Sequence, residues 1–350
     1  MAYSVGAMGV TYIFLPPLKK PTGGLAVLHQ VAAHLHASGR EVRLAPREAG
    51  AWRPEISSGV PETPWNELQL GPGDVWLAPE GWPGALAPGL KSGARCVVYC
   101  QNWAYLFSGL PEGVSLAELG VRFLAVSEPV ALYIRETLGR EAPVLRPGID
   151  LNLFSAPEKK PEAAAGGPVR VAYMPRKNSA LAARIRETCD AKAVAGTGPR
   201  IIWEEIKDLP PQSVAECLKR SHIFLATGFP EGCPLPPLEA MACGLMVVGF
   251  AGFGGFDYMR NVEGAPQGAY EPWWEMRNVE WGGNGLFTAD ADVLGAARCL
   301  QAAAEWAAAG DERYRLAVAG ARKTAAAYGL DEQRRNVLAV WRELESDMSR

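Results

Sequence analysis

Short apolar runs alternate with helix-patterned segments along most of this 350-residue chain, and this alternation constrains the fold more than any other feature. Residues 10–15 form an apolar, β-branched run, residues 25–39 repeat apolar side chains at helical spacing, and residues 41–46 form a second apolar run. The pattern recurs over residues 74–80, 94–103, 121–139 and 142–150. Apolar strands that alternate with helices predict a mainly parallel sheet covered on both faces.

A second alternating series follows a segment of different composition. Residues 155–168 are rich in Pro, Ala, Gly and charge without an apolar period, which is typical of a linker. Alternation resumes at residue 169, with a helix around residues 181–189 and a separate segment at 191–196. Ligands of such sheets bind beyond the carboxyl ends of the strands. We predict a first domain of residues 1–156, a linker of 157–168, a second domain of 169–330, and a last helix within 331–350 that crosses back to the first domain.

Charge and cysteine usage exclude several function classes. The chain has 35 Lys and Arg against 38 Asp and Glu, so its net charge of -3 leaves no global field that attracts nucleic acid or an anionic membrane. The seven cysteines show no zinc-ligand spacing, which favours free thiols in a reducing compartment. The N-terminal residues lack the layout of a signal peptide, and no apolar stretch approaches the roughly 18 residues of a membrane span. We therefore expect a cytoplasmic protein.

Residues 227–244 carry the most informative motif, between apolar runs at 222–226 and 245–250. A strand, a glycine-containing loop and a helix in this order direct backbone N–H groups and a helix N-terminus toward an anion. Pro236 and Pro237 suit the first positions of that helix, where the missing proline N–H would be unpaired anyway. Glu231 lies in the loop and Glu239 just inside the helix, so both carboxylates can face one cleft.

The motif EGCPLPPLEAMACG resembles the E-x7-E signature of retaining GT-B glycosyltransferases, the family 4 or "glycosyl transferases group 1" class. Other landmarks of that family follow the expected order, namely a double glycine after the first strand, AVSEPVALYI, VLRPGIDLNLF and NGLF. The resemblance spans nearly the whole chain. It implies an α/β GT-B fold, in which two Rossmann-like doubly wound domains, an N-terminal acceptor domain and a C-terminal nucleotide-sugar donor domain, face a central cleft.

The resemblance also implies roles for residues of the second domain. Arg176 and Lys177 occupy the loop that holds the donor diphosphate in this family, and two cations there stabilise the charge on the departing group. They are adjacent here, whereas the family usually separates them, so which one touches phosphate stays open; a solvated basic turn is the alternative. By the same resemblance Glu231 approaches hydroxyls of the donor sugar and Glu239 accepts from the ribose. The backbone expected to hold sugar and phosphate belongs to Gly232, Cys233, Pro234 and Leu235.

In the first domain, Gly23 and Gly24 resemble the glycine pair that lets the backbone approach the donor phosphates or the acceptor, although a helix-start turn explains them equally well. Gln101 stands where many family members carry a histidine, and it remains a polar ligand for the sugar. Retaining members react on one face of the sugar, and the departing phosphate takes the acceptor proton, so no protein base is required. The four histidines, His29, His34, His36 and His222, are interpreted as structural.

Two other patterns favour simpler explanations, and a third leaves two interpretations open. Asp290 and Asp292 form a D-x-D string that opens a helix, which capping explains better than metal binding. Residues 249–256 resemble a dinucleotide-binding loop, but Asp257 replaces its last glycine; in the family Gly254 and Gly255 would line the donor sugar. The aromatic segment 258–281 either stacks on sugar rings or bases, or covers its own core.

Together these observations predict transfer of a hexose-type sugar from a nucleotide-diphosphate sugar to a hydroxyl acceptor, with retention and without a metal or other cofactor. A saccharide or glycoconjugate is the expected acceptor. A hydroxylated base in DNA is the alternative acceptor, and a non-catalytic sugar-nucleotide binding protein is the alternative from another class. A glycosidase using the carboxylate pair is disfavoured, because it needs no anion pocket.

Overall fold

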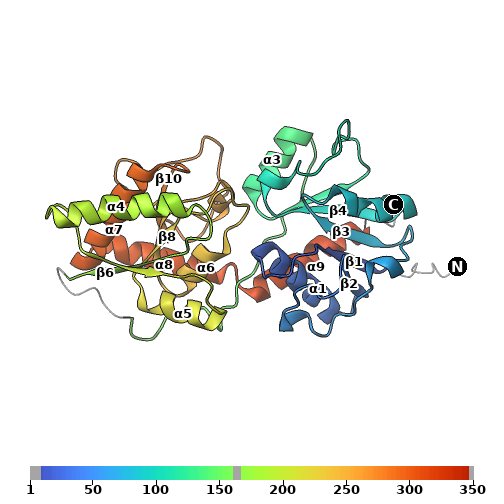
Figure 1. Ribbon diagram of the computed structural model, residues 1–350, viewed down its shortest axis with the longest axis horizontal. Helices are drawn as coiled ribbons and strands as arrows, with labels where there is room; N and C mark the ends of the chain where they lie inside the picture. The colour runs from blue at the N-terminus through green and yellow to red at the C-terminus, as the bar shows by residue number, and fades with distance from the viewer. Residues whose placement is uncertain (1–8, 161–166, 347–350) are drawn as a thin grey trace. The chain divides into compact units, whose positions relative to one another are not determined.

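A computed structural model describes residues 9–160 and 167–346, which form two compact units (Figure 1). The first unit contains the chain up to Gly148 and again from Asp331, and the second runs from Ile149 to Leu330. The division thus differs from the predicted one, which placed the first domain at 1–156 and a linker at 157–168. Of that linker, 161–166 lie outside the described residues. Lys160 belongs to the second unit because its Nζ donates to the carbonyl of Gly244 at 2.8 Å.

The first unit is built on a five-stranded parallel sheet of order β2-β1-β3-β4-β5. Its strands are the apolar runs of the sequence, and β1 and β3 are buried at every residue, as expected for a sheet covered on both faces. The bounds are β1 Thr11–Leu15, α1 Gly23–Ala37, β2 Val42–Pro46, β3 Val75–Pro79, α2 Ala87–Ser92, β4 Arg95–Cys100, β5 Arg122–Ala125 and α3 Glu128–Leu138.

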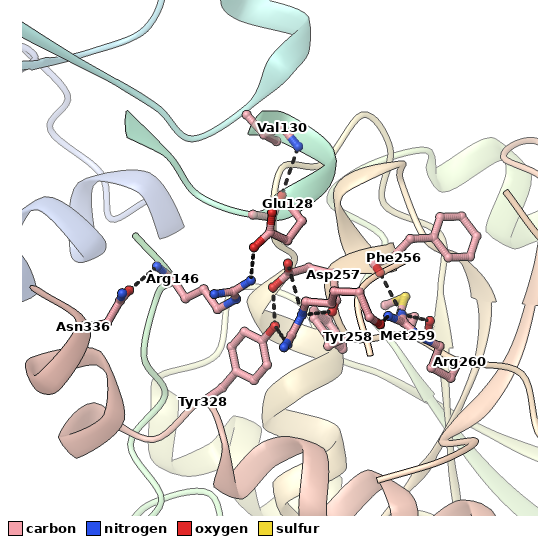
Figure 2. A network of polar contacts seen from close by, with 12 residues as sticks. Glu128, Val130, Arg146, Phe256, Asp257, Tyr258, Met259, Arg260, Tyr328 and Asn336 are labelled. Atoms are coloured by element: carbon pink, nitrogen blue, oxygen red, sulfur yellow. Dashed lines mark hydrogen bonds and ion pairs between the residues drawn. The ribbon is translucent and has the colours of Figure 1, made fainter. Parts of the chain in front are cut away.

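The last helix, α9 (Leu330–Ser346), completes the first unit. The indole of Trp341 is fully buried, and its Nε1–H donates to Oγ1 of Thr11 in β1 at 3.1 Å. The side chain of Asn336 accepts from the backbone N–H of Arg146 at 2.9 Å, as Figure 2 shows. Arg40, just after α1, forms an ion pair with Glu345 at 2.8 Å. The fold of this unit therefore combines segments almost 200 residues apart in sequence, since Arg146 and Asn336 are separated by 190 positions.

The second unit repeats the same architecture with a parallel sheet of order β10-β9-β8-β6-β7. Figure 1 shows α4 and α7 on one side of this sheet and α5 on the other. One apolar cluster joins α4, α7 and the strands. The bounds are β6 Val169–Tyr173, α4 Ser179–Val194, β7 Ile201–Glu205, α5 Pro211–Arg220, β8 Ile223–Ala226, α6 Leu235–Ala242, β9 Met246–Phe250, β10 Gly285–Thr288, α7 Val293–Ala309 and α8 Glu312–Ala326.

Each sheet has one point at which the strand order reverses. In the first sheet this point lies between β1 and β3, and in the second it lies between β6 and β8. Consecutive connections leave such a point toward opposite faces, which opens a crevice beyond the carboxyl ends of the two strands. The loops after β6 and β8 are those that contain Lys177 and Glu231, so topology alone places both at the crevice of the second unit.

Candidate functional site

A pocket of about 680 Å³ occupies this crevice of the second unit. The loop after β6 contributes Arg176 and Lys177 to its lining, and the loop after β8 contributes Glu231. The first turn of α6 adds Pro236 and Pro237. The sequence-predicted charged residues of the second domain, apart from Glu239, therefore line one pocket.

Lys177 is held at the rim of the pocket by contacts with the opposite loop. Its Nζ lies 2.8 Å from Oε1 of Glu231 and donates to the carbonyl of Pro230 at 3.1 Å. The side chains of Lys177 and Glu231 remain 31% and 21% exposed, so both are accessible from the pocket. Their charges fix each other's position, because each restricts the rotamers of the other.

Asn178 ties the two loops together and begins α4. It adopts the left-handed backbone conformation, with φ 56°, which Asn tolerates better than most residues. Its Nδ2 donates to the carbonyls of Thr227 and Phe229 at 2.9 and 3.0 Å, and its side chain therefore makes no capping bond to α4. No described side chain caps the first N–H groups of α4, and Ser179 at its start is one of the lining residues. This helix start is a second place where backbone groups favour an anion.

Arg176 is exposed beside Lys177, and no described side chain pairs with it. The lining also contains Arg186 and Lys207, two cations that the sequence analysis did not identify. Arg186 of α4 donates to the hydroxyl of Tyr173, which in turn donates to Oε2 of Glu205 at 2.5 Å. Ser179, Ala183 and Arg186 line the pocket from one face of α4. Their spacing of four and three residues is the signal that could have revealed this face.

The helix α6 begins where the motif predicts. Pro234 is its N-cap residue, and Pro236 and Pro237 occupy the first turn. Glu239 lies one turn into the helix, is partly exposed and does not line the pocket. Although part of the residue is exposed, protein atoms surround its carboxyl, and this desolvation raises its pKa to about 7. Gly232, Cys233 and Leu235 are not among the residues that line the pocket, whereas Pro234 is, and the expected contact of this backbone with sugar and phosphate stays a prediction.

A glycine-rich turn after β9 packs against the loop that carries Glu231. The backbone N–H of Glu231 donates to the carbonyl of Gly252 at 2.9 Å. An added Cβ at Gly252 would lie 2.7 Å from Cβ of Glu231, and one at Gly254 would lie 1.8 Å from the carbonyl oxygen of Gly232. No larger residue fits at these two positions without moving backbone. Gly254 packs against this loop; neither Gly254 nor Gly255 is among the residues that line the pocket, and their expected contact with the donor sugar stays a prediction.

A buried polar network anchors this turn from behind. Figure 2 shows the hydroxyl of Tyr328 pointing at the carboxylate of Asp257, to which it donates. The same carboxylate, fully buried, lies 3.5 Å from Nε of Arg277, and Arg277 also donates to the Asp257 carbonyl at 2.8 Å. A buried carboxylate needs such partners to offset lost hydration. Segment 258–281 is thus fixed to the body of the second unit through Arg277, and Trp281 donates to the carbonyl of Tyr258.

In the first unit, the structure brings Gly24 and Gln101 together at the crevice between β1 and β3. Thr22 caps α1, and a Cβ at Gly24 would lie 3.2 Å from Oε1 of Gln101. A larger residue at this position would require the Gln101 side chain to shift slightly. Gly23 is the first residue of α1.

Glu80, which the sequence analysis missed, stands next to this pair at the end of β3. Its Oε2 accepts from the backbone N–H of Gln101 at 2.8 Å. Burial raises the pKa of Glu80 to about 7, although backbone hydrogen bonds from Gln101 and Asn102 act in the opposite direction. Glu80 directly follows β3, one of the two strands between which the strand order reverses, and this position could have identified it.

The patterns interpreted as structural have structural partners. His29 is fully buried between the carbonyl of Trp52 and the hydroxyl of Ser57, and burial lowers its pKa to about 4. Asp292 caps α7 by accepting from the N–H of Gly295 at 2.8 Å, as predicted.

Two searches of the described part of the chain gave negative results. It contains no group of three or more His, Cys, Asp or Glu side chains that could hold a metal ion. None of its helices has the length and hydropathy needed to span a bilayer.

Two doubly wound parallel units with a pocket at the order reversal define the class of fold as that of the GT-B glycosyltransferases, and comparison with known proteins agrees. Residues 202–264, which run from β7 past the Glu231 loop, match the family model "Glycosyl transferases group 1". A search of curated protein sequences found no match.

Solved structures resemble the chain over almost its whole length. Sucrose-phosphate synthase from Thermosynechococcus elongatus has a TM-score of 0.64 at 14% identity, over 97% of this chain and 100% of that one. The catalytic domain of starch synthase IV from Arabidopsis thaliana, bound to ADP and acarbose, has a TM-score of 0.59 at 14% identity, over 94% and 99%. The lipopolysaccharide outer core galactosyltransferase WaaB has a TM-score of 0.57 at 13% identity, over 96% and 100%. The predicted fold class is confirmed.

Proposed function

We propose that this protein transfers a hexose-type sugar from a nucleotide-diphosphate sugar to a hydroxyl acceptor, with retention at the anomeric carbon and without a metal ion. The arrangement of charge around the pocket carries this proposal. Arg176, Lys177 and the uncapped start of α4 offer positive charge and N–H groups at one rim. Glu231 and the start of α6 lie across from them. A diphosphate fits the first group of residues, and sugar hydroxyls fit the carboxylate.

The chemistry follows from this placement. As the glycosidic bond breaks, negative charge develops on the leaving diphosphate, and Arg176 and Lys177 stabilise it in a partly water-excluded pocket. Glu231 accepts hydrogen bonds from sugar hydroxyls and orients the ring. A departing phosphate oxygen takes the proton of the acceptor hydroxyl on the same face of the sugar, which gives retention without a protein base. A saccharide or glycoconjugate acceptor binds the first unit near Gly24, Gln101 and Glu80.

A thermal-shift screen against UDP-, GDP-, TDP- and ADP-sugars tests the donor site. A ligand that binds only the folded protein stabilises it by about 2.7 kcal/mol at a concentration of roughly 100 Kd. We expect one nucleotide class to raise Tm by several degrees. If none of these donors raises Tm, the assignment of the pocket is wrong.

Product analysis then tests the stereochemistry and the metal requirement. With the donor found in the screen, proton NMR of the product reports the anomeric configuration, which we expect to match that of the donor. Turnover should persist in excess EDTA. An inverted product, or full loss of turnover restored by a divalent cation, contradicts the corresponding part of the proposal.

A further inference from the structure

A second hollow, of about 720 Å³, lies at the opposite edge of the second sheet. Its lining includes Gly244, which comes just before β9, and Tyr314, whose hydroxyl donates at 3.0 Å to the carbonyl of His222, the residue before β8. In a parallel sheet all amino ends lie at one edge. The hollow is therefore at the amino edge, whereas the pocket with Lys177 lies beyond the carboxyl edge.

Basic side chains dominate this amino-edge hollow. Its lining contains Lys159, Lys160, Arg315 and Arg322 but a single acidic residue, Glu158. Arg315 lies 2.7 Å from Glu312, an exposed pair that screens its charge. Among the described residues, no carboxylate pairs with the other three cations. The hollow therefore carries a local positive charge that the net charge of the chain does not reveal.

Two of these cations converge on Gly244. Lys160 Nζ donates to the carbonyls of Cys243 and Gly244 at 3.0 and 2.8 Å, at the C-terminal end of α6. A Cβ at Gly244 would lie 3.2 Å from Nε and Nη2 of Arg322, so the guanidinium rests against the same glycine. Burial lowers the pKa of Lys160 to about 7, and the charge of Arg322 acts in the same direction. The charge of Arg322 thus disfavours the protonated form of Lys160, and an anion bound beside both groups would favour it.

We propose that the amino-edge hollow is a second anion site, which binds a ligand bearing one or two phosphate groups. The ammonium of Lys160 acts as a point charge, while the planar guanidinium of Arg322 can contact two phosphate oxygens at once. Lys159, exposed on the rim, adds long-range attraction. The volume exceeds that of a free phosphate and leaves room for the rest of a phosphorylated molecule or of a lipid headgroup.

Pyrophosphate titration with matched variants of the full chain tests this site. The site variant combines Lys159→Ala with Arg322→Ala. The control is Arg184→Ala, on the same unit. The Arg184 side chain is 70% exposed and forms an ion pair with Glu187. A third protein combines Arg176→Ala with Lys177→Ala, which removes the cations of the proposed donor pocket and separates the two sites.

We expect calorimetry to show pyrophosphate binding to wild type, to the Arg184→Ala control and to the variant altered in the proposed donor pocket. When Lys159→Ala and Arg322→Ala are added to the Arg176→Ala, Lys177→Ala protein, in which the proposed donor pocket no longer contributes, binding should weaken at least tenfold with an unchanged circular dichroism spectrum. Arg322→Gln added to the same protein should give an intermediate loss. If the added substitutions leave the affinity unchanged, the proposal is overturned. Loss of all binding in the variant altered at Arg176 and Lys177 also overturns the proposal of a second site. That result would still be consistent with the proposed donor site.

Vesicle sedimentation distinguishes the source of the phosphate. Phosphatidylglycerol vesicles should carry wild type into the pellet, and not the Lys159→Ala, Arg322→Ala variant, if the ligand is a lipid headgroup. Pyrophosphate binding without sedimentation assigns the site to a soluble phosphorylated molecule. Absence of both kinds of binding rejects the site.

Discussion

Replacement of Lys177 by alanine separates a role in the reaction from a role in folding. The change removes an ion pair with Glu231 in which both side chains are partly exposed, worth about 0–1 kcal/mol. It also removes a 3.1 Å hydrogen bond to the carbonyl of Pro230, worth about 1 kcal/mol. The total cost to folding is then at most about 2 kcal/mol. For a domain of this size that lowers Tm by about 4–8 °C.

The expected cost to turnover is larger. If Lys177 stabilises charge on the departing diphosphate, its loss should slow transfer by about 100- to 1000-fold, as for removal of one donor from a site of developing charge. The assay measures initial rates while the concentration of the donor identified by thermal shift is varied at a fixed acceptor concentration. It is run at a temperature at which the variant is folded. Because the contact strengthens in the transition state, kcat should fall more than KM rises.

Lys192→Ala is the matched control for this experiment. Lys192 lies on α4, donates from Nζ to Oε1 of Gln301 at 2.8 Å and does not line the pocket. It should keep turnover within about twofold of wild type, as expected for a residue that contributes no contact to the reaction. If Lys177→Ala retains more than a tenth of wild-type kcat, or if Lys192→Ala loses as much, the reasoning about transition-state charge is refuted.

Three further substitutions test other parts of the structure. Gly254→Ala places a Cβ within 1.8 Å of the Gly232 carbonyl oxygen, so urea denaturation should show a free energy of unfolding lower by about 1–3 kcal/mol. The control Gly59→Ala, where an added Cβ meets no atom within 4 Å, should lower it far less. Burial raises the pKa of Glu239 from 4.5 to about 7, so the native state favours the neutral acid and wild type loses stability as pH rises between these values. Glu239→Gln should flatten this dependence of Tm on pH, and parallel profiles for the two proteins would contradict the pKa. Glu80→Gln should raise the KM for the acceptor and leave the donor-induced rise in Tm unchanged, because Glu80 belongs to the first unit. Loss of the donor-induced rise in Tm would contradict the assignment of the acceptor to the first unit and the donor to the second.

Most strands could be predicted because a strand buried on both faces has to be apolar throughout, as in β1, β3 and β9. Two predictions failed for identifiable reasons. Residues 142–150 form no strand and only two isolated bridges, from Val144 to Ala125 and from Ile149 to Gly329, since Pro143 and Pro147 interrupt strand pairing. Residues 191–196 mostly continue α4, and Val194 is 90% exposed, so its hydrophobicity was no signal of burial.

The candidate site was predictable where residues sit in loops directly after strands, as Lys177 and Glu231 do. Arg186 was missed because a helix brings it to the pocket, and only knowledge of which face of α4 borders the crevice reveals it. Glu80 was missed because its meaning depends on the strand order, which sequence periodicity does not report. The sequence analysis placed the end of the first domain at residue 156, whereas the structure places it at Gly148. Composition identifies polar segments but does not show that Lys160 contacts the end of α6 in the second unit.

The packing of α9 has a consequence for the order in which the protein can be made. Trp341 is buried in the first unit, which contains the chain up to Gly148 and again from Asp331. The residues from Ile149 to Leu330 belong to the second unit. During synthesis on the ribosome the first unit therefore emerges early yet lacks part of its core until the last helix arrives. The second unit, continuous in sequence, can complete its sheet first. A ribosome that stalls between residues 330 and 341 would release one finished unit and one unfinished unit, and the unfinished one would expose the apolar surface that Trp341 normally covers.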